Sequence, residues 1–159
     1  MMEIGLVVNG AHQRAEVSPG ETLLELLRRL GFTSVKDGCA NGDCGACAVL
    51  LGGRAVTSCL VFAVKADGVA ITTMEGMTAA EGVLHPLQRA LLDTGGVQCG
   101  FCIPAMALTA LDLLAHHAHP SRQEIESYLV GNLCRCTGYV KQVEAVERTV
   151  DWMREAGIG

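Results

Sequence analysis

The chain has 159 residues and half of them are hydrophobic, so it is long enough to bury a core as one ordinary domain or two small ones. Its 17 acidic residues outnumber its 12 basic ones, and the net charge of -5, with only 4% aromatic residues, argues against a nucleic-acid partner. Because the N-terminus carries no export signal and no apolar stretch approaches the roughly 20 residues of a membrane helix, we expect a cytoplasmic protein.

The first half of the chain is predicted to be rich in sheet. Alternating hydrophobic residues over 3–8 lead to Asn9-Gly10, which is a strong signal for the turn of a β-hairpin. A second hairpin turns at Gly52-Gly53. Its strands, and one further strand, are predicted over 48–51, 54–56 and 70–73.

One helix interrupts these strands. Ser18 is placed as its N-cap, Pro19 takes the first helical position and Glu21 completes a capping box. Leucines then repeat at helical spacing, and Gly31 is able to end the helix in a left-handed conformation. The sequence therefore predicts a helix that starts at Ser18 and ends at Gly31.

Every periodic segment after Met77 is helical. Helices are predicted over 84–94, ended by Gly95-Gly96, over 103–114, from a capping box of Ser121 and Glu124 to Gly131, and over 143–153. The segment 103–114 is apolar on almost all sides, so it should be the buried central helix. We predict an α+β protein with a domain boundary near 75–83, which separates a sheet-rich domain over 1–76 from a helical bundle over 83–159.

Eight cysteines are more than packing requires, and thiols stay reduced in the cytoplasm, so metal ligands are a better interpretation than disulfides. Cys39, Cys44, Cys47 and Cys59 follow the spacing Cys-x4-Cys-x2-Cys and a later Cys, which is the plant-type 2Fe-2S pattern. Three ligands on a short loop must wrap tightly around the inorganic core. Interleaved glycines allow this, because they adopt positive φ and let backbone N–H groups turn toward sulfur; they are Gly38, Gly42 and Gly45.

A second set of four cysteines lies in the helical half. Cys99 and Cys102 open the apolar helix, whose positive N-terminal end favours thiolates, and Cys134 and Cys136 lie between the last two helices. A bundle is able to bring these two helix junctions to one end. The sequence therefore predicts a second four-thiolate site.

Other interpretations of these residues remain open. Four cysteines also bind zinc, although the single residue between Cys134 and Cys136 is short for a zinc knuckle. A redox-active dithiol at Cys99 and Cys102 lacks its usual βαβ context. The histidines of the cluster at 116–119 suit the end of a helix dipole better than a metal. No nucleophile triad or phosphate-binding loop is present, so we expect no substrate chemistry on this chain.

The motifs around the cysteines strongly resemble a known family. They read Gly-Cys-Ala-Asn-Gly-Asp-Cys-Gly-Ala-Cys over 38–47, Gln-Cys-Gly-Phe-Cys over 98–102 and Gly-Asn-Leu-Cys-Arg-Cys-Thr-Gly-Tyr over 131–139. Over nearly its whole length the chain is similar to the iron-sulfur subunit of the xanthine oxidase family of molybdenum hydroxylases. The resemblance implies a β-grasp ferredoxin domain followed by a four-helix bundle.

It also implies the cofactors and partners. The first cysteine set would hold the 2Fe-2S cluster nearer an FAD on a medium subunit, and the second set would hold the cluster nearer the molybdenum cofactor on a large subunit. Gln98 and Cys136 match positions that contact the molybdopterin. The residues after Cys47 and Cys102, often Ser or Thr in the family, are Ala48 and Ile103, so we predict lower cluster potentials than in relatives that carry the hydroxyl.

The leading hypothesis is thus an electron-transfer subunit of a molybdenum hydroxylase. A free-standing two-cluster ferredoxin and a zinc-stapled interaction module are the alternatives.

Overall fold

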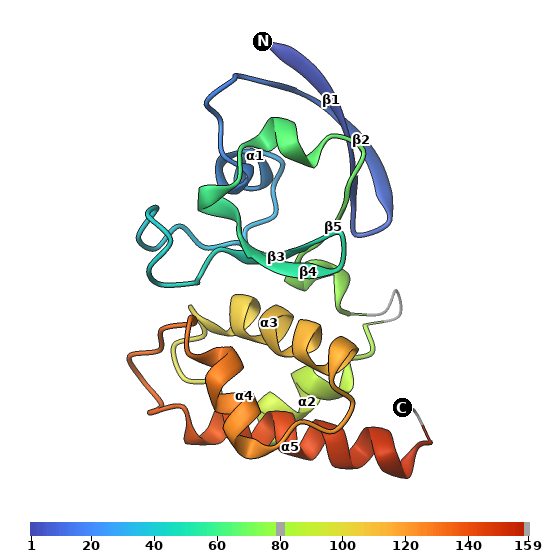
Figure 1. The fold of residues 1–159 in the computed structure, drawn as a ribbon, viewed down its shortest axis with the longest axis vertical. Helices are drawn as coiled ribbons and strands as arrows, with labels where there is room; N and C mark the ends of the chain where they lie inside the picture. The colour runs from blue at the N-terminus through green and yellow to red at the C-terminus, as the bar shows by residue number, and fades with distance from the viewer. Residues whose placement is uncertain (79–81, 158–159) are drawn as a thin grey trace.

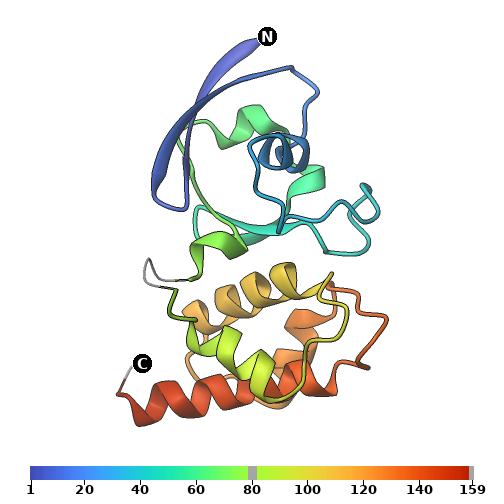
Figure 2. The ribbon, with the colours of Figure 1, turned by 180° about the vertical axis from the view of Figure 1, so that it is seen from behind.

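The structure is a computed structural model that describes residues 1–78 and 82–157. It is a mixed α+β fold, as predicted, in which a sheet-rich half stacks on a helical half (Figure 1). The view from behind shows the same two layers, with the long last helix on the outer side of the helical half (Figure 2). The predicted boundary at 75–83 includes residues 79–81, which lie outside the described residues, and it stays a prediction.

One five-stranded sheet has the order β2-β1-β5-β3-β4. The β1–β2 hairpin turns at Asn9 (φ 52°) and Gly10 (φ 81°), as the sequence predicts. β5 pairs parallel to β1 and antiparallel to β3, so it joins the two hairpins into one sheet. The strands are β1 (Met2–Val8), β2 (Ala11–Val17), β3 (Ala48–Leu51), β4 (Arg54–Thr57) and β5 (Ala70–Thr72).

The predicted start of the first helix is wrong. Helix α1 covers Leu23–Arg29, and its N-cap is Thr22, which exchanges the two capping-box bonds with Glu25. Ser18 instead begins a turn. The difference arises because residues 21–23 pair with residues 61–63 in an antiparallel β-bridge. The Glu21 carbonyl oxygen accepts the N–H of residue 63, and the Leu23 N–H donates to the carbonyl oxygen of residue 61, so this stretch is extended and not helical. The end of the helix is as predicted, with Gly31 at a φ of 96°.

Four helices form the other half, and α3 is the central one, as predicted. Ten of its fourteen residues are buried. Ser121 and Glu124 form the predicted capping box of α4. The second helix begins two residues later than predicted, because His85 caps it and Pro86 takes its first turn. The helices are α2 (Pro86–Asp93), α3 (Ile103–His116), α4 (Arg122–Leu129) and α5 (Val140–Glu155).

Each half has its own core. One lies between the sheet and α1, and the other lies among α2, α3, α4 and α5. Strand β3 contributes side chains to both cores, because successive side chains of a strand point to opposite faces of the sheet. Val49 is buried in the first core and Leu50 in the second. Helix α3 packs directly under β3 and β4, so the two halves share one interface.

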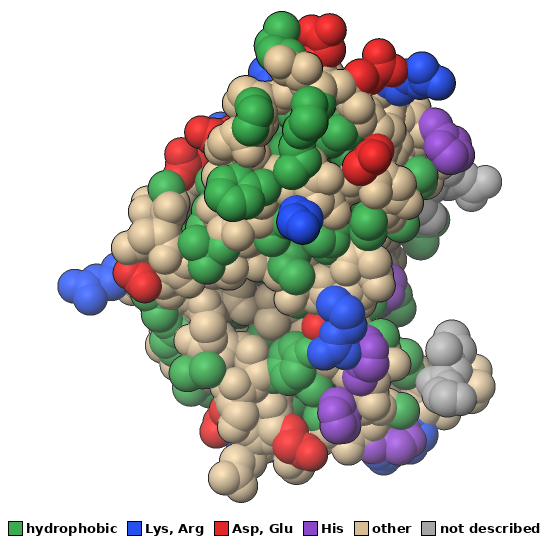
Figure 3. Space-filling view, turned by 45° about the horizontal axis from the view of Figure 1, so that its top comes forward, with side chains coloured by type: hydrophobic (Ala, Val, Ile, Leu, Met, Phe, Trp, Pro, Cys, Tyr) green, Lys and Arg blue, Asp and Glu red, His purple; other side chains and the backbone are tan. Residues whose placement is uncertain are grey.

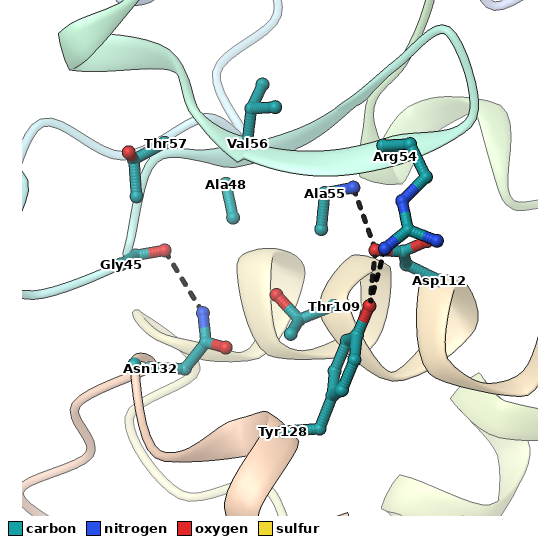
Figure 4. Close-up of a pocket in the computed structure, with 11 residues that line it drawn as sticks. Gly45, Ala48, Arg54, Ala55, Val56, Thr57, Thr109, Asp112, Tyr128 and Asn132 are labelled. Carbon is teal, nitrogen blue, oxygen red and sulfur yellow. Dashed lines mark hydrogen bonds and ion pairs between the residues drawn. The ribbon is translucent and has the colours of Figure 1, made fainter. Parts of the chain in front are cut away.

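A buried carboxylate fastens this interface. Asp112 of α3 is 2% exposed, and its Oδ2 accepts hydrogen bonds from the Ala55 N–H of β4 (3.0 Å) and from the Tyr128 hydroxyl of α4 (2.8 Å). Arg54 lies 3.5 Å from the other oxygen. Figure 4 shows these groups at one side of a pocket of about 250 Å³ between the sheet and the helices.

None of the helices in the described part of the chain combines the length and the apolar character needed to cross a membrane.

Candidate metal centres

The first cysteine set lies where the sequence predicts an irregular loop, between α1 and β3, and in the 3-10 turn Ser58–Leu60 after β4. The Cys44 N–H donates to the Cys39 sulfur over 3.3 Å. The Ser58 hydroxyl donates to the Cys47 carbonyl oxygen over 2.7 Å and so ties the loop to the turn that carries Cys59. These two bonds hold Cys39 close to Cys44, and Cys47 close to the turn that carries Cys59.

The loop wraps closely around its own sulfurs. Gly42 (φ 90°) and Gly45 (φ 68°) adopt the expected positive φ, but Gly38 does not; a Cβ at Gly38 would lie 2.8 Å from the Cys44 sulfur, so glycine serves there for close approach. Backbone N–H groups of Asn41 and Cys44 turn toward Cys39 and lower the pKa of its thiol to about 7. Burial, with Cys47 beside it, raises the pKa of Cys59 to about 11. Backbone N–H groups of Ala46 and Gly42 also turn toward Cys44 and Cys59, so the loop offers donors to several of its sulfurs.

The second set comes from two junctions between helices, as predicted. Cys102 is the N-cap of α3 and Cys99 precedes it, whereas Cys134 and Cys136 lie between α4 and α5. The thiols lie in two pairs, with Cys102 beside Cys134 and Cys99 beside Cys136. Burial raises the pKa of Cys102 to about 12, whereas Cys99 and Cys136 are exposed.

The first set is paired in the same way, with the Cys39 thiol beside that of Cys44 and the Cys47 thiol beside that of Cys59. A 2Fe-2S group takes four thiolates on two irons, so two pairs of thiols fit it. A single zinc ion instead needs its ligands gathered at about 2.3 Å around one point. The paired donor sets therefore fit the two irons of a 2Fe-2S group.

The two cysteine loops touch each other. The Leu133 N–H donates to the Cys44 carbonyl oxygen over 2.9 Å. The Asn132 side-chain amide donates to the neighbouring Gly45 carbonyl oxygen over 3.1 Å, the bond marked at the left of Figure 4. A Cβ at Gly45 would lie 2.2 Å from the Gly131 carbonyl oxygen, so this approach requires glycine. The two sites are thus joined by main chain.

Two family models match the chain, one over each cysteine set. Residues 6–70 match the family model of the 2Fe-2S iron-sulfur cluster binding domain, and residues 73–147 match that of the 2Fe-2S binding domain. The chain is 46% identical to the nicotinate dehydrogenase small FeS subunit of Eubacterium barkeri, over 93% of this chain and 94% of that one. It is 44% identical to the xanthine dehydrogenase iron-sulfur-binding subunit of Escherichia coli O157:H7, over 90% and 91%.

The chain belongs to the 2Fe-2S subunits of the xanthine oxidase family of molybdenum hydroxylases. A solved structure agrees with this assignment. The 2Fe-2S subunit superimposes on the aldehyde oxidoreductase of Desulfovibrio desulfuricans with a TM-score of 0.93 and 41% identity, covering 98% of this chain and 17% of that one. The expected family is confirmed, and with it the role of an electron-transfer subunit.

The two residues that the resemblance links to molybdopterin lie at the surface of the 2Fe-2S subunit. Gln98 and Cys136 are both exposed, and Gln98 directly precedes the exposed Cys99. Cys99 and Cys136 form one thiol pair, so both residues belong to the outer end of the second set.

The histidine cluster behaves as the end of a helix. His116 Nδ1 lies 2.8 Å from the carbonyl oxygen of Asp112, and the His117 N–H donates to the carbonyl of Leu113. Figure 3 shows histidine side chains grouped on the surface of the helical half. They are not assembled with other ligands into a metal site among the residues that the structure describes.

Sequence reasoning missed three polar residues that contact the cysteine loops. Asn132 is 3% exposed and holds the first loop, as described above. Thr137 and Gln142 contact the sulfur of Cys134. Asn132 and Thr137 stand inside a motif that the resemblance already singled out, but Gln142 has no local signal, since it is one polar residue in the first turn of a helix.

Proposed function

We propose that this subunit relays single electrons from a molybdenum cofactor on a large subunit to an FAD on a medium subunit. One 2Fe-2S cluster would be held by Cys39, Cys44, Cys47 and Cys59, and a second by Cys99, Cys102, Cys134 and Cys136. Such clusters, when bound, supply sites that accept and release one electron at a time.

The observation that carries the proposal is the hydrogen bond from the Leu133 N–H to the Cys44 carbonyl oxygen. Cys134 follows Leu133 directly, so a ligand of each cluster stands at either end of this contact. The route from the Cys134 sulfur to the Cys44 sulfur therefore runs through covalent bonds and a single 2.9 Å hydrogen bond. A short route through bonded atoms favours electron transfer between two fixed centres.

The two ends of the relay differ in their exposed groups. The second cluster's outer ligands, Cys99 and Cys136, are exposed beside Gln98, which supports docking of the large subunit here, with Gln98 and Cys136 against the molybdopterin. At the first cluster, Leu60 (62% exposed) and Phe62 (53% exposed) flank Cys59. Exposed apolar side chains beside a redox centre suit a protein partner, and we assign this face to the FAD subunit.

The same proposal includes the domain architecture and the compartment. Residues 1–76 would form a β-grasp ferredoxin-like domain, and residues 83–159 a four-helix bundle. The compartment would be the cytoplasm, where reducing conditions keep ligand cysteines from forming disulfides.

The test is to express the subunit with the neighbouring chains of its complex, purify the assembly without air and analyse it. We expect about four irons and four acid-labile sulfides per chain, and two distinct electron paramagnetic resonance signals after reduction. Zinc in place of iron would overturn the proposed clusters. Two signals in a chain that purifies with no molybdenum-containing subunit would instead support a free-standing carrier.

A further inference from the structure

Two side chains that bind no cluster reach the sulfur of Cys134. Gln142, in the first turn of α5, is 1% exposed, and its Nε2 lies 3.9 Å from the Cys134 sulfur and 2.8 Å from the Gly96 carbonyl oxygen. The Thr137 hydroxyl lies 3.2 Å from the same sulfur and 2.8 Å from the Gln142 Oε1. The three side chains form one connected group at the second cysteine set.

The number of protons on each group determines which side chain donates and which accepts in these hydrogen bonds. As a thiolate ligand, Cys134 has no proton and only accepts. The Gln142 amide has two N–H groups, and with one given to Gly96 the other is free for sulfur. The Thr137 hydroxyl has one proton to give to sulfur or to the Gln142 oxygen, while its own oxygen accepts the Tyr139 N–H. The Gln142 N–H is thus the donor to the Cys134 sulfur, and the Thr137 hydroxyl becomes a second donor when its one proton turns from the Gln142 oxygen to the sulfur.

Such donors favour the reduced state. Reduction adds one negative charge to the sulfur-bound centre, and a hydrogen bond to a ligand sulfur is stronger when the sulfur carries more charge. The effect is largest where solvent is excluded, and Gln142 is almost completely buried. Electrons that leave the molybdenum cofactor would arrive at this cluster, so a raised potential here favours their transfer.

We propose that Gln142 and Thr137 set the reduction potential of the second cluster by donating hydrogen bonds to the Cys134 sulfur. This inference rests on the proposed cluster ligands. The two residues act through Cys134 and are positioning residues. In the first cluster, the Cys39 sulfur accepts the N–H of Cys44 from its own loop, so we expect the potential of that cluster not to depend on Gln142 and Thr137.

The experiment is a redox titration of the intact complex in which the electron paramagnetic resonance signal of each cluster is followed separately. The variants are Gln142→Leu, Thr137→Val and Thr137→Ser. We expect Gln142→Leu and Thr137→Val each to lower the potential of the second cluster. The equilibrium constant for its reduction should fall roughly three- to tenfold, where tenfold is about 59 mV for one electron. Thr137→Ser keeps the hydroxyl and should keep the wild-type potential.

The matched control is Thr149→Val. Thr149 is a buried threonine of the same helix α5 whose hydroxyl donates to the Ala145 carbonyl oxygen (2.8 Å). Its loss should lower stability without moving either potential. Thr137→Val also keeps the inference testable if Gln142→Leu does not assemble, because Thr137 is only half-buried.

An unchanged second potential in Thr137→Val, or an equal shift of both clusters, would overturn the inference while leaving the proposed function intact. Absence of two signals in the wild-type complex would overturn the proposed function itself.

Discussion

Single residues in the first cysteine loop decide how closely the two cysteine loops approach each other. Gly45 has a φ of 68°, and a Cβ there would overlap the Gly131 carbonyl oxygen of the second loop. Backbone atoms are on both sides of this contact, so no flexible side chain is able to relieve the overlap.

We therefore expect Gly45→Ala to be far more harmful than an ordinary glycine substitution. Gly53, in the β3–β4 turn, is the matched control, because it has a φ of 83° and nothing within 4 Å of its Cβ position. Gly53→Ala should cost about 1–2 kcal/mol from backbone strain alone. Gly45→Ala should cost about 1–3 kcal/mol more from overlap. Thermal unfolding, followed by the visible absorption of the clusters, measures both; equal losses would contradict the prediction.

The residue after Cys47 offers a second test. Ala48 is buried at the first position of β3 and lines the pocket at the interface, where Figure 4 shows it between the sheet and α3. The pocket leaves room for the larger side chain. We expect Ala48→Thr, which adds a hydroxyl beside the first cluster, to raise that cluster's potential. A redox titration in which the first signal does not move upward would refute this, and Ala48→Val controls for the added bulk.

At the scale of elements, the start of α1 shows what sequence patterns decide and what they leave open. Ser18 and Glu21 have the spacing of a capping box, but so do Thr22 and Glu25, and the structure uses the second pair. Local chemistry does not choose between two such boxes. The choice comes from the pairing of this segment with residues 61–63, which lie far along the chain.

The two candidate caps give a direct comparison. Thr22→Ala removes the hydroxyl that accepts the Glu25 N–H (3.2 Å), so it should lower the free energy of unfolding by about 1 kcal/mol. Ser18→Ala should change it by less than about half of that, because Ser18 caps no helix. Denaturant unfolding of the two variants side by side measures the difference; a larger loss in Ser18→Ala would restore the earlier start of the helix.

The hairpins, the capping box of α4 and the central position of α3 were predictable for a common reason: each depends on residues that are close in sequence. The cysteine loops were predictable because the spacing of the cysteines in the sequence is typical of 2Fe-2S ligands. Ala40 was not predictable, since it adopts a φ of 55° in a loop where only glycines were expected to do so. Gln142 was not predictable either, because its partners Gly96 and Cys134 come from other segments.

In the molecule as a whole, two separate groups of hydrogen bonds hold the sheet-rich half against the helical half. Asp112 joins α3 to β4 and α4, whereas Asn132 and Leu133 join the two cysteine loops. Only the second group, the hydrogen bonds of Asn132 and Leu133, lies between the proposed clusters. Loss of either group of hydrogen bonds should weaken the interface. Loss of the bonds of Asn132 and Leu133 should also lengthen the path of electron transfer between the clusters.

The last prediction separates these two effects. Asn132→Ala removes the bond to the Gly45 carbonyl oxygen, and without it the neighbouring contact from Leu133 to Cys44 is less firmly held. We expect slower electron transfer between the clusters and a weaker magnetic interaction between their signals.

Asp112→Asn is the matched control, because it weakens the bonds to Ala55 and Tyr128 at the other side of the interface. Both variants should lose about 1–3 kcal/mol of stability, the cost of a buried group left poorly paired. If rapid mixing with a reductant showed the same slowing in both variants, the rate would depend on general tightness of the interface and not on the contact between the loops.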